Sequence, residues 1–453
     1  MFNKVLIANR GEIALRVIRA CQDLVIPTAI LYSGFDKKDH LQAKFADFAY
    51  FMGALKPLDT YMDIKQIIRV AQHNKVDAIH PGYGFLSENA AFAEACQDAG
   101  ITFIGPNSKA IKQMGDKIES RKIAKQAGLE VVPGFEDVTI NNVKELAEKI
   151  GYPVMLKASA GGGGRGMQVV YNSGEIETVF ETLQQYAEKF FGNKTVFLEK
   201  YLDTPRHIEI QIMADKYGNV IHLGERECSI QRRNQKMIEE APSPVITPEM
   251  RQIMGEKACA LARAVGYDSI GTIEFIFQDG KFYFLEMNTR IQVEHPVTEA
   301  VTGIDLVKCQ IEIAADKPLK YKQDDVQFSG HSIEFRICAE NPLDFLPCPA
   351  TITQYIAPSD FGVRIDSSAY AGFEVSKHFD SLISKLIVLG SDRNEAIRRM
   401  QRALNQFVIE GPKTTIPILK AILASDSFRQ GNISTNFLEN HPALFELAKE
   451  FVK

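Results

Sequence analysis

The sequence lacks paired cysteines, long apolar runs and an excess of positive charge. Its seven cysteines are scattered singly with no CxxC pair, which indicates reduced thiols and argues against disulfides or a structural zinc site. No apolar run approaches the roughly eighteen residues of a membrane span, and the N-terminal run is too short for the core of a signal peptide. The formal net charge of −5 gives no electrostatic footprint for nucleic acid. We therefore expect a cytoplasmic protein that binds neither membranes nor nucleic acid.

Low-complexity linkers and repeats at solenoid spacing are also missing, which indicates folded domains rather than a linker-rich or repeat protein. Hydrophobic residues make up 45% and charged residues 24% of the 453 residues, as in ordinary soluble globular proteins. A chain of this length is expected to form roughly three domains.

Strand-then-helix units dominate about the first 110 residues. The segments KVLIAN at 4–9 and RGEIALRVIRACQ at 10–22 are typical of a buried strand followed by an amphipathic helix. TAILYS at 28–33, the segment 76–100 and ITFIGP at 101–106 continue the pattern. Such alternation predicts a parallel α/β sheet.

The middle of the chain is instead typical of antiparallel strands. Segments 207–215 and 219–231 alternate apolar and polar residues, as half-buried strands do. Asp279 and Gly280 lie between two runs of period two, which predicts a β-hairpin over residues 271–288.

A run of glycines separates two predicted strands in ASAGGGGRGMQVV, residues 158–170. Gly161, Gly163 and Gly166 satisfy the dinucleotide fingerprint G-x-G-x-x-G, but that motif requires a helix next, and a strand follows here. A P-loop requires Lys and Ser or Thr after the last glycine, and a protein kinase requires its lysine after the loop, whereas Lys157 precedes this one. A surface hairpin without a ligand would need only one or two glycines. The pattern favours a loop that binds nucleotide phosphates.

Polar residues recur at every second position of LEMNTRIQVEHP, residues 285–296. Alternate side chains share one face of a strand, so a solvated edge strand is one interpretation. An extended run of this length would cover roughly 26 Å, and we expect the strand to end near Asn288 and the remainder to curl around a site. The polar set comprises Glu286, Asn288, Arg290, Gln292 and Glu294.

Glu274 lies on the other strand of the predicted hairpin, among apolar neighbours. It could converge with Glu286 and Asn288 across the hairpin. Carboxylate and amide oxygens without histidine or cysteine suit a hard cation, and Mg²⁺ shared with substrate phosphates is the usual occupant. Downstream, Arg290 offers a planar fork that matches a small oxyanion, and Glu294 is a possible base.

In their order and number, these motifs resemble those of the ATP-grasp enzymes, and more closely those of the biotin carboxylase family, the ATP-dependent component of acetyl-CoA, propionyl-CoA and pyruvate carboxylases. The resemblance covers nearly the whole chain, through KVLIANRGEIALRVIRA, HPGYGFLSENA, MGDK, KASAGGGGRGM, ERECSIQRRNQKMIEEAP, FLEMNTRIQVEHPVTE and FRICAENP. It implies an α/β and α+β fold, with a Rossmann-like N-terminal domain at 1–113, an ATP-grasp domain at 114–330 that includes a small mobile lid at about 132–203, and a C-terminal domain at 331–446.

The resemblance also implies which residues bind the nucleotide and its metal. One group would contact the phosphates, a second would read the adenine edge, a third would lie beside the ribose, and a fourth would hold Mg²⁺ or, alternatively, Mn²⁺. These groups are Lys117, Lys157, His207, Gly161, Gly162, Gly163, Gly164 and Gly166 for ATP and its phosphates; Glu199, Lys200 and Leu202 for adenine; Gln231 and Asn234 for the ribose and phosphates; and Glu274, Glu286 and Asn288 for the metal.

The reaction implied by the resemblance is the carboxylation of biotin. Bicarbonate is a poor nucleophile, so ATP would first convert it to carboxyphosphate, in a phosphoryl transfer that depends on positive charge around the γ-phosphate. Glu294 would deprotonate bicarbonate, and Arg336 would stabilise the enolate form of biotin. Bicarbonate itself would be held by Lys236, Arg290, Gln292 and the Val293 backbone.

Partners are also implied. No Met-Lys-Met biotinylation site occurs in the sequence, so we expect biotin on a separate biotin carboxyl carrier protein. The second expected partner is a carboxyltransferase subunit, and the expected assembly is a homodimer. Asn234 stands where many family members have histidine, and asparagine can donate a hydrogen bond but cannot carry charge.

Two other functions share part of this pattern. Another ATP-grasp ligase, joining a carboxylate to an amine, would use the same ATP and metal residues, but nothing in that class requires the segment RIQVEHPVTE. A regulatory protein that binds nucleotide without catalysis would have lost a metal or base residue, and the metal set and Glu294 are all present.

Single residues have simpler interpretations. His80 in HPGYG is expected in a structural turn, and Cys228 is expected to pack in a core. Arg232 and Arg233 are equally compatible with ordinary surface charge and with contacts to the carrier or the nucleotide.

Overall fold

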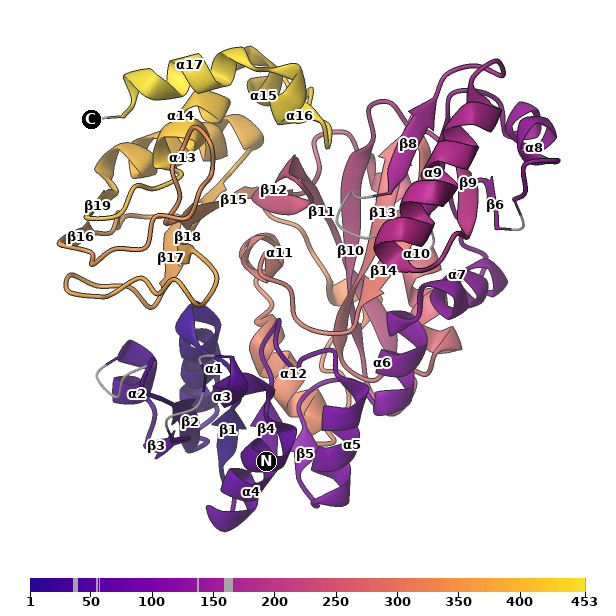
Figure 1. Cartoon of the computed structure of the whole chain (residues 1–453). Helices are drawn as coiled ribbons and strands as arrows, with labels where there is room; N and C mark the ends of the chain where they lie inside the picture. Colours follow the sequence, from indigo (N-terminus) through magenta and orange to yellow (C-terminus); the bar gives the residue numbers. More distant parts are fainter. Residues whose placement is uncertain (36–39, 54–55, 57, 137, 159–165, 453) are drawn as a thin grey trace.

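The computed structural model of the chain describes residues 1–35, 40–53, 56, 58–136, 138–158 and 166–452 (Figure 1). Figure 1 shows the indigo N-terminal part, the yellow C-terminal part and a small magenta unit around α9 (Ile176–Phe191) arranged about a central sheet. Gly161, Gly162, Gly163 and Gly164 lie outside the described residues. Among the helices within the described ranges, none has the length and apolar character needed to cross a membrane.

The N-terminal part is the predicted parallel α/β unit. Its strands pair in parallel in the order β3-β2-β1-β4-β5, and the apolar residues of β1 are all buried between helices. The strand at 101–106 is shorter than predicted. The elements are β1 (Val5–Ile7), α1 (Gly11–Asp23), β2 (Thr28–Tyr32), α2 (Leu41–Phe45), β3 (Phe48–Phe51), α3 (Asp59–Met62), α4 (Ile64–His73), β4 (Ala78–His80), α5 (Ala90–Asp98) and β5 (Thr102–Phe103).

A small antiparallel unit follows helices α6 (Ser108–Gly115) and α7 (Lys117–Gln126). Its strands are ordered β6-β9-β7-β8, and helices α8 and α9 pack on one side over an apolar cluster of their own. Strands β7 and β8 lie on either side of the glycine run, as predicted, and residues 159–165 themselves lie outside the described ranges. The elements are β6 (Gly134–Phe135), α8 (Val143–Ile150), β7 (Val154–Ala158), β8 (Met167–Val170), α9 (Ile176–Phe191) and β9 (Val196–Lys200).

The central and C-terminal parts share an antiparallel sheet in the order β14-β13-β10-β11-β12-β15-β18-β17. The sheet continues across Gly330 and His331, because β12 pairs directly with β15. Its elements are β10 (Arg206–Ala214), β11 (Val220–Arg232), β12 (Gln235–Ala241), α10 (Pro248–Ala264), β13 (Ile270–Gln278), β14 (Lys281–Asn288), α11 (His295–Thr302), α12 (Leu306–Ala314), a 3₁₀ turn (Gln323–Asp325), β15 (His331–Cys338), β17 (Val363–Ser367) and β18 (Leu382–Gly390).

The end of the chain covers the C-terminal half of this sheet. Helices α13 and α14 pack their apolar side chains against β15 and β18. A short ladder of β16 with β19 lies beside them. The elements are β16 (Gln354–Ile356), α13 (Arg393–Gln406), β19 (Val408–Glu410), α14 (Ile416–Ala424), α15 (Asp426–Arg429), α16 (Phe437–Asn440) and α17 (Ala443–Glu450).

The two faces of the central sheet differ in chemistry. Ile210, Ile273 and Met287 pack with α10 in an apolar core on one face. Alternate residues of the same strands, such as Glu209 and Glu274, point to the other face and are also buried. The predicted half-burial of 207–215 and 219–231 is therefore wrong, because β10 and β11 are buried along nearly their whole lengths. Polar side chains of β11 bind neighbouring elements instead of facing water, as Arg226 binds Glu209 and Glu225 binds Arg251.

The hairpin and the end of β14 are confirmed. β13 and β14 pair antiparallel, with Asp279 (φ +52°) and Gly280 (φ +75°) in the left-handed region at the turn, as a two-residue hairpin loop requires. A bulge at Leu285 follows Phe284. The strand ends at Asn288, and the chain then curls toward α11.

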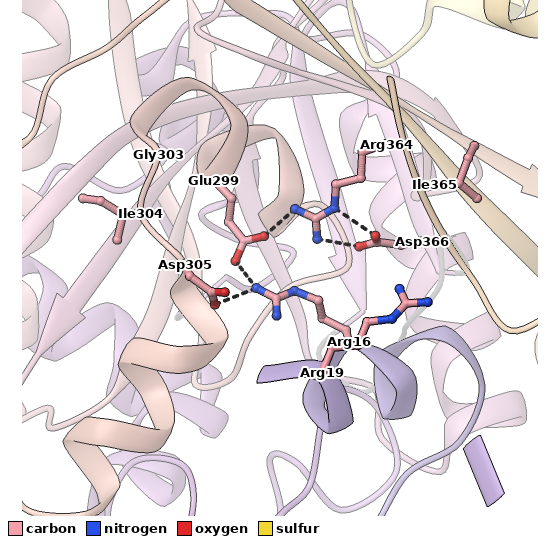
Figure 2. Close-up of a pocket in the computed structure, with 9 residues that line it drawn as sticks. All are labelled: Arg16, Arg19, Glu299, Gly303, Ile304, Asp305, Arg364, Ile365 and Asp366. Atoms are coloured by element: carbon pink, nitrogen blue, oxygen red, sulfur yellow. Dashed lines mark hydrogen bonds and ion pairs between the residues drawn. The ribbon is translucent and has the colours of Figure 1, made fainter. Parts of the chain in front are cut away.

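Ionic contacts join the three parts of the chain near α11 (Figure 2). Arg16 of α1 lies 2.7 Å from Glu299 Oε1 and 2.6 Å from Asp305 Oδ1 through its Nη2 atom. Arg364 of β17 lies 2.7 Å from Glu299 Oε2 through Nη1, and it also holds Asp366. Glu299 thus bridges the N-terminal and C-terminal parts, and it fixes the helix that follows the predicted bicarbonate segment.

Candidate active site

Lys236 lies at the centre of a buried ionic cluster on the polar face of the central sheet. Its ammonium group donates to Glu209 Oε2 at 2.6 Å, to Glu274 Oε1 at 2.9 Å and to Glu294 Oε1 at 2.6 Å. Burial alone would lower the pKa of Lys236, but these three carboxylates raise it well above its usual value. The fold therefore brings together predicted residues from β12, from β13 and from the segment before α11.

Glu294, the predicted base, is fully buried between two cations. Besides Lys236, it accepts a hydrogen bond from Arg336 Nη2 at 3.0 Å. Burial alone would raise the pKa of Glu294, but Lys236, Arg336 and Arg226 lower it well below its usual value. The carboxylate is therefore ionised in this arrangement. An anion that drew Lys236 and Arg336 toward itself would increase the proton affinity of Glu294.

Arg336 forms a second ion pair, with Glu239. The distances to Glu239 Oε1 are 2.6 Å from Nε and 2.5 Å from Nη2. Burial alone would lower the pKa of Arg336, but Glu239, Glu294 and Glu334 raise it well above its usual value. A guanidinium fixed in this way offers a charge of constant position to an anionic substrate.

Arg290 follows β14 and is oriented by three groups. Its Nε donates to Glu88 Oε2 at 2.9 Å, its Nη2 to Asn288 Oδ1 at 2.8 Å, and its Nη1 to the Ile291 carbonyl at 3.3 Å. Glu88 also accepts from the Thr289 backbone N–H at 3.0 Å. The N-terminal part therefore positions the arginine that was predicted to bind bicarbonate.

Gln292 and Val293 complete the predicted bicarbonate set. Gln292 Nε2 donates to Glu274 Oε1 at 2.9 Å. The Val293 carbonyl accepts from Lys385 Nζ at 2.8 Å, and this buried lysine also lies 3.2 Å from Glu12 of α1. The backbone of the segment is thus anchored by side chains from both ends of the chain.

The predicted metal ligands converge at the β13–β14 hairpin. Glu274 and Glu286 are directly opposite each other, and Asn288 Nδ2 donates to Glu274 Oε1 at 2.9 Å. The pKa of Glu286 is raised above its usual value, mainly because the carboxyl group is partly desolvated and secondly because it faces the negative charge of Glu274. Glu286 keeps a solvent-exposed side and makes no hydrogen bond or ion pair with the described residues. Two facing carboxylates, one of them free, form a donor set that suits a divalent cation shared with phosphates.

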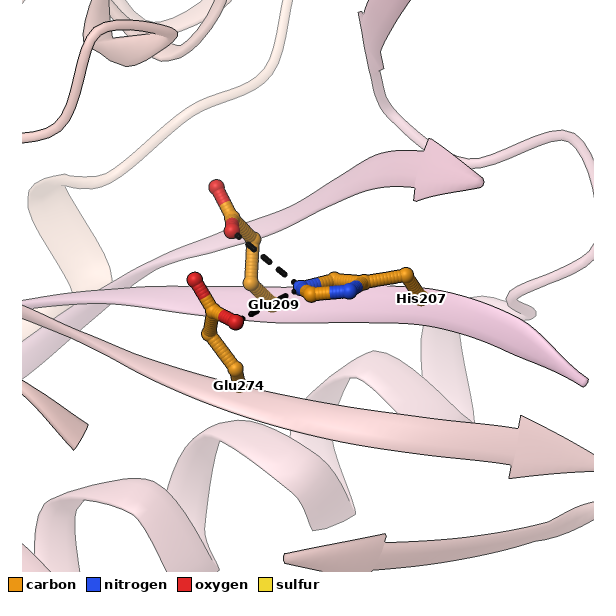
Figure 3. Close-up of side chains that lie close together, drawn as sticks. All are labelled: His207, Glu209 and Glu274. Atoms are coloured by element: carbon orange, nitrogen blue, oxygen red, sulfur yellow. Dashed lines mark ion pairs between the residues drawn. The ribbon is translucent and has the colours of Figure 1, made fainter. Parts of the chain in front are cut away.

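His207 lies beside Glu274 and Glu209 (Figure 3). Its Nε2 is 2.8 Å from Glu274 Oε2 and 3.8 Å from Glu209 Oε2. Gln231 Nε2 lies 3.0 Å from the other ring nitrogen, Nδ1, and an amide NH₂ can only donate, so the ring proton belongs on Nε2. In this tautomer His207 faces the carboxylates as a donor and not as a metal ligand.

Lys157 forms an ion pair on the small antiparallel unit. Its Nζ is 2.5 Å from Glu199 Oε2, while Arg121 Nη1 is 2.6 Å from Glu199 Oε1. Burial alone would raise the pKa of Glu199, but Lys157 and Arg121 lower it. Both carboxylate oxygens of Glu199 are therefore engaged in ion pairs, and its backbone lies in an inner strand, opposite Gly134 on one side and Met155 on the other.

The other predicted nucleotide residues are spread around the small unit and the neighbouring hairpin. Gly166 has φ +75° and accepts from the Ala158 N–H at 2.7 Å. Lys200 Nζ donates to the carbonyl groups of Gly151 and Tyr152, at 2.9 and 3.2 Å. The remaining placements are Lys117 exposed at the start of α7, Leu202 half-buried after β9, Gln231 buried in β11, and Asn234 exposed in the left-handed turn between β11 and β12.

Several residues of the site were not selected from the sequence. A sequence pattern could have indicated Glu209, because His207, Glu209 and Gln211 alternate with isoleucines along β10 and therefore share one face of the strand. Lys385 also had a signal, as a lone charge in the apolar run LISKLIVL. Glu88 had none, because its partner Arg290 lies 202 positions away in the chain.

The structure also places the single residues for which the sequence favoured a structural or surface role. His80 is buried and accepts from the Gly82 N–H at 3.0 Å, as a structural turn requires. Cys228 is fully buried. Arg232 Nη1 donates to the Phe345 carbonyl at 3.0 Å, so it joins two parts of the molecule, whereas Arg233 is exposed.

Comparison with known families matches the chain in three segments. Residues 1–111 match the biotin carboxylase N-terminal domain, 116–322 the ATP-binding domain of the carbamoyl-phosphate synthase L chain, and 334–440 the biotin carboxylase C-terminal domain. With the sheet and site described above, these matches define an ATP-dependent ligase of the ATP-grasp class.

Curated relatives and solved structures narrow this class. The chain is 53% identical to one of the subunits of the pyruvate carboxylase of Methanothermobacter thermautotrophicus, over 97% of this chain and 90% of that protein. It is 51% identical to biotin carboxylase 1 of Bacillus subtilis, over 98% and 100%. The biotin carboxylase domain dimer of the 2-oxoglutarate carboxylase of Hydrogenobacter thermophilus, solved with MgADP, ADP and bicarbonate, has a TM-score of 0.90 at 50% identity, covering 98% of this chain and 99% of that chain. The protein belongs to the biotin carboxylase family.

Proposed function

We propose that this protein uses ATP to carboxylate biotin with bicarbonate, the biotin being borne by a separate carrier protein. The observation that carries the proposal is the arrangement around Glu294, a buried carboxylate bonded to Lys236 and Arg336, with Arg290 fixed on the same segment. A base surrounded by cations suits a reaction in which an anion is held and deprotonated.

In the first step, Arg290 and Lys236 would hold bicarbonate, and Glu294 would accept its proton as the bicarbonate oxygen attacks the γ-phosphorus of ATP. The bond from that phosphorus to the ADP oxygen breaks, and carboxyphosphate and ADP result. The cations compensate the negative charge that develops on the transferring group. Lys157 and the backbone of the glycine loop would bind the phosphates of ATP.

In the second step, the bond between the carboxyl carbon and the phosphate oxygen of carboxyphosphate would break, which releases CO₂ and phosphate. The phosphate would take the proton of the ureido N–H of biotin, and the nitrogen would then bond to CO₂. Arg336 would stabilise the enolate form of biotin, because its guanidinium is already held in place by Glu239. Water destroys carboxyphosphate, so the site must exclude it. We assign this task to the unit at 132–203, acting as a lid over the phosphates.

Glu274 and Glu286 would hold Mg²⁺, with Asn288 beside them. When bound, the ion would neutralise charge on the phosphates of ATP. The relative solved with MgADP and bicarbonate supports both ligands for this chain.

The proposal extends to assembly. A biotin carboxyl carrier protein and a carboxyltransferase subunit would be the partners, and a homodimer the assembly, since one relative was solved as a dimer. The final acceptor is set by the carboxyltransferase, and relatives named for pyruvate and for 2-oxoglutarate both align over nearly the full chain.

The proposed function is tested by trapping carboxybiotin. The protein is incubated with ATP, Mg²⁺, free biotin and radiolabelled bicarbonate, and label is counted in acid-labile carboxybiotin. We expect labelling that requires ATP and falls at least about a hundredfold in Arg290→Met. The matched control is Arg398→Met, an exposed position on α13, which should label as the parent does. No ATP-dependent label in the parent protein would refute the proposal.

A further inference from the structure

Glu334 is a buried carboxyl group that no cation neutralises directly. It lies in the middle of β15 with no solvent exposure, and neither of its carboxylate oxygens has a hydrogen-bond partner among the described residues. The nearest cations are already engaged: Lys385 with Val293, Glu12 and Asp366, and Arg336 with Glu239 and Glu294. An isolated ionised carboxylate in such a position is far less stable than the neutral acid.

Glu239 faces it from the neighbouring strand. β12 and β15 pair antiparallel with Glu239 opposite Glu334, so the two side chains share one face of the sheet at cross-strand distance. One oxygen of Glu239 binds Arg336, while the other, Oε2, is buried without a partner in the described part of the chain. If the two carboxyl groups share a single proton, the protonated group donates a hydrogen bond and the ionised group accepts it. This bond gives a partner to buried carboxyl oxygens that otherwise have none.

We propose that Glu239 and Glu334 share one proton and act as a positioning pair for Arg336. Glu334, as the neutral member, donates to Glu239 Oε2, which keeps Glu239 Oε1 turned toward the guanidinium. The pair then carries one negative charge instead of two, so Arg336 keeps its positive potential for the anionic substrate. The role of Arg336 in this inference rests on the proposed function; the shared proton does not.

The surroundings support this distribution of charge. Burial, partly offset by Arg336, raises the pKa of Glu239 to about 7, and burial and Glu239 raise the pKa of Glu334 well above its usual value despite the opposing charge of Lys385. The charged and titratable groups that act on the pair are Lys236 of β12, Arg336 of β15, Lys385 of β18, Glu294 before α11 and Tyr83 of the N-terminal part. Glu12, Arg364 and Asp366 surround Lys385 in turn.

Infrared spectroscopy of the full chain tests the shared proton directly. At neutral pH the parent protein should show the carbonyl stretch of a protonated carboxylic acid. This band should be lost in Glu334→Gln. In Glu239→Gln it should remain but shift in frequency, because Glu334 is still buried and neutral while the acceptor of its proton changes from a carboxylate to an amide. Glu240→Gln is the matched control: Glu240 is the next residue of β12, faces the other side, and is ionised by His331 and Arg393, so no such band should be lost. A Glu334→Gln protein that retains the band, or a Glu239→Gln protein whose band keeps the frequency of the parent, would overturn the proposal.

Turnover supplies the second readout. Glu334→Gln keeps a neutral donor opposite Glu239, so kcat at neutral pH should fall less than about threefold, whereas Glu334→Ala removes the donor and should lower kcat at least about tenfold. In the parent protein, kcat should decline at alkaline pH as the shared proton is lost. This decline should be absent in Glu334→Gln, because the amide has no proton to lose in this range. A residue with only a packing role would not change the pH dependence of kcat. Equal kcat losses in the two variants, or an unchanged alkaline decline, would contradict the proposal. The infrared result does not depend on turnover, so a missing carboxylation activity and a missing proton are separate outcomes.

Discussion

The side chains proposed to be catalytic are charged because of their neighbours. Lys236, Glu294 and Arg336 are all deeply buried, and burial alone would disfavour the ionised form of each. They remain charged because cations and carboxylates alternate through the cluster. An anionic substrate can therefore replace one ionic contact with another, without leaving a bare charge in a medium of low dielectric constant.

Glu294→Gln should abolish carboxylation while leaving ATP binding largely intact. The amide fills the same space but cannot accept the proton of bicarbonate, and loss of a general base typically costs about a hundredfold or more in kcat. Carboxybiotin formation and the equilibrium affinity for ATP are the two measurements. Glu340→Gln, a buried carboxyl that contacts Ser381 outside the site, is the control. An equal loss of nucleotide affinity in Glu294→Gln would exclude the role of base.

Glu240→Gln should destabilise the fold in a pH-dependent way. Burial alone would raise the pKa of Glu240, but His331 and Arg393 lower this pKa to about 2. A lowered pKa stabilises the folded state above the unfolded value of 4.5, and this stabilisation disappears as the pH falls toward 2. The variant should lose about 3 kcal/mol at pH 7, measured by denaturant unfolding. A difference from the parent that stays constant between pH 7 and pH 3 would contradict this origin.

At the scale of elements, the hairpin and the parallel sheet were predictable because their signals are local. The period-two runs around Asp279 and Gly280 specify β13 and β14, and the alternation at 285–296 indicated which side chains share a face. Burial of β11 was not predictable from the sequence. Its polar residues look solvated until the partners of Arg226, namely Glu209 and Gln211, are brought beside it by strand pairing.

Gly166→Ala should weaken the use of ATP through the backbone of the proposed lid. Gly166 follows the glycine run with φ +75°, where a Cβ costs about 1 kcal/mol or more. We expect KM for ATP to rise about fivefold or more, with a smaller change in KM for bicarbonate. Steady-state kinetics with each substrate varied in turn measures both. Gly34→Ala is the control, because a Cβ there meets open space. Equal changes in both KM values would argue against a role specific to the nucleotide.

At the scale of the whole molecule, the site exists only where three parts of the chain meet. The hairpin supplies Glu274 and Glu286, the C-terminal part supplies Arg336 and Lys385, and the N-terminal part supplies Glu88. Motif order indicated the family and most of the residues, because each motif is contiguous. The supporting residue Glu88 was missed because its contact with Arg290 spans 202 positions, and no local pattern encodes such a pair. The lone charge of Lys385 in an apolar run marks a buried group, but it does not indicate the contact with Val293, 92 positions away.

The continuous sheet also links the parts mechanically. β12 and β15 pair across the boundary between the ATP-grasp and C-terminal segments, so Lys236 and Arg336 lie on one rigid surface. The small unit of β6 to β9 has its own sheet and apolar cluster, which is the organisation expected of a part that moves as a body.

The most direct test of the proposed reaction is ADP release from MgATP by the intact protein, measured with and without bicarbonate and with and without free biotin. We predict that ADP release requires bicarbonate and that free biotin increases it, because carboxyphosphate forms only when Arg290, Lys236 and Glu294 hold bicarbonate. ADP release that is indifferent to both bicarbonate and biotin would contradict the assignment of this site to biotin carboxylation.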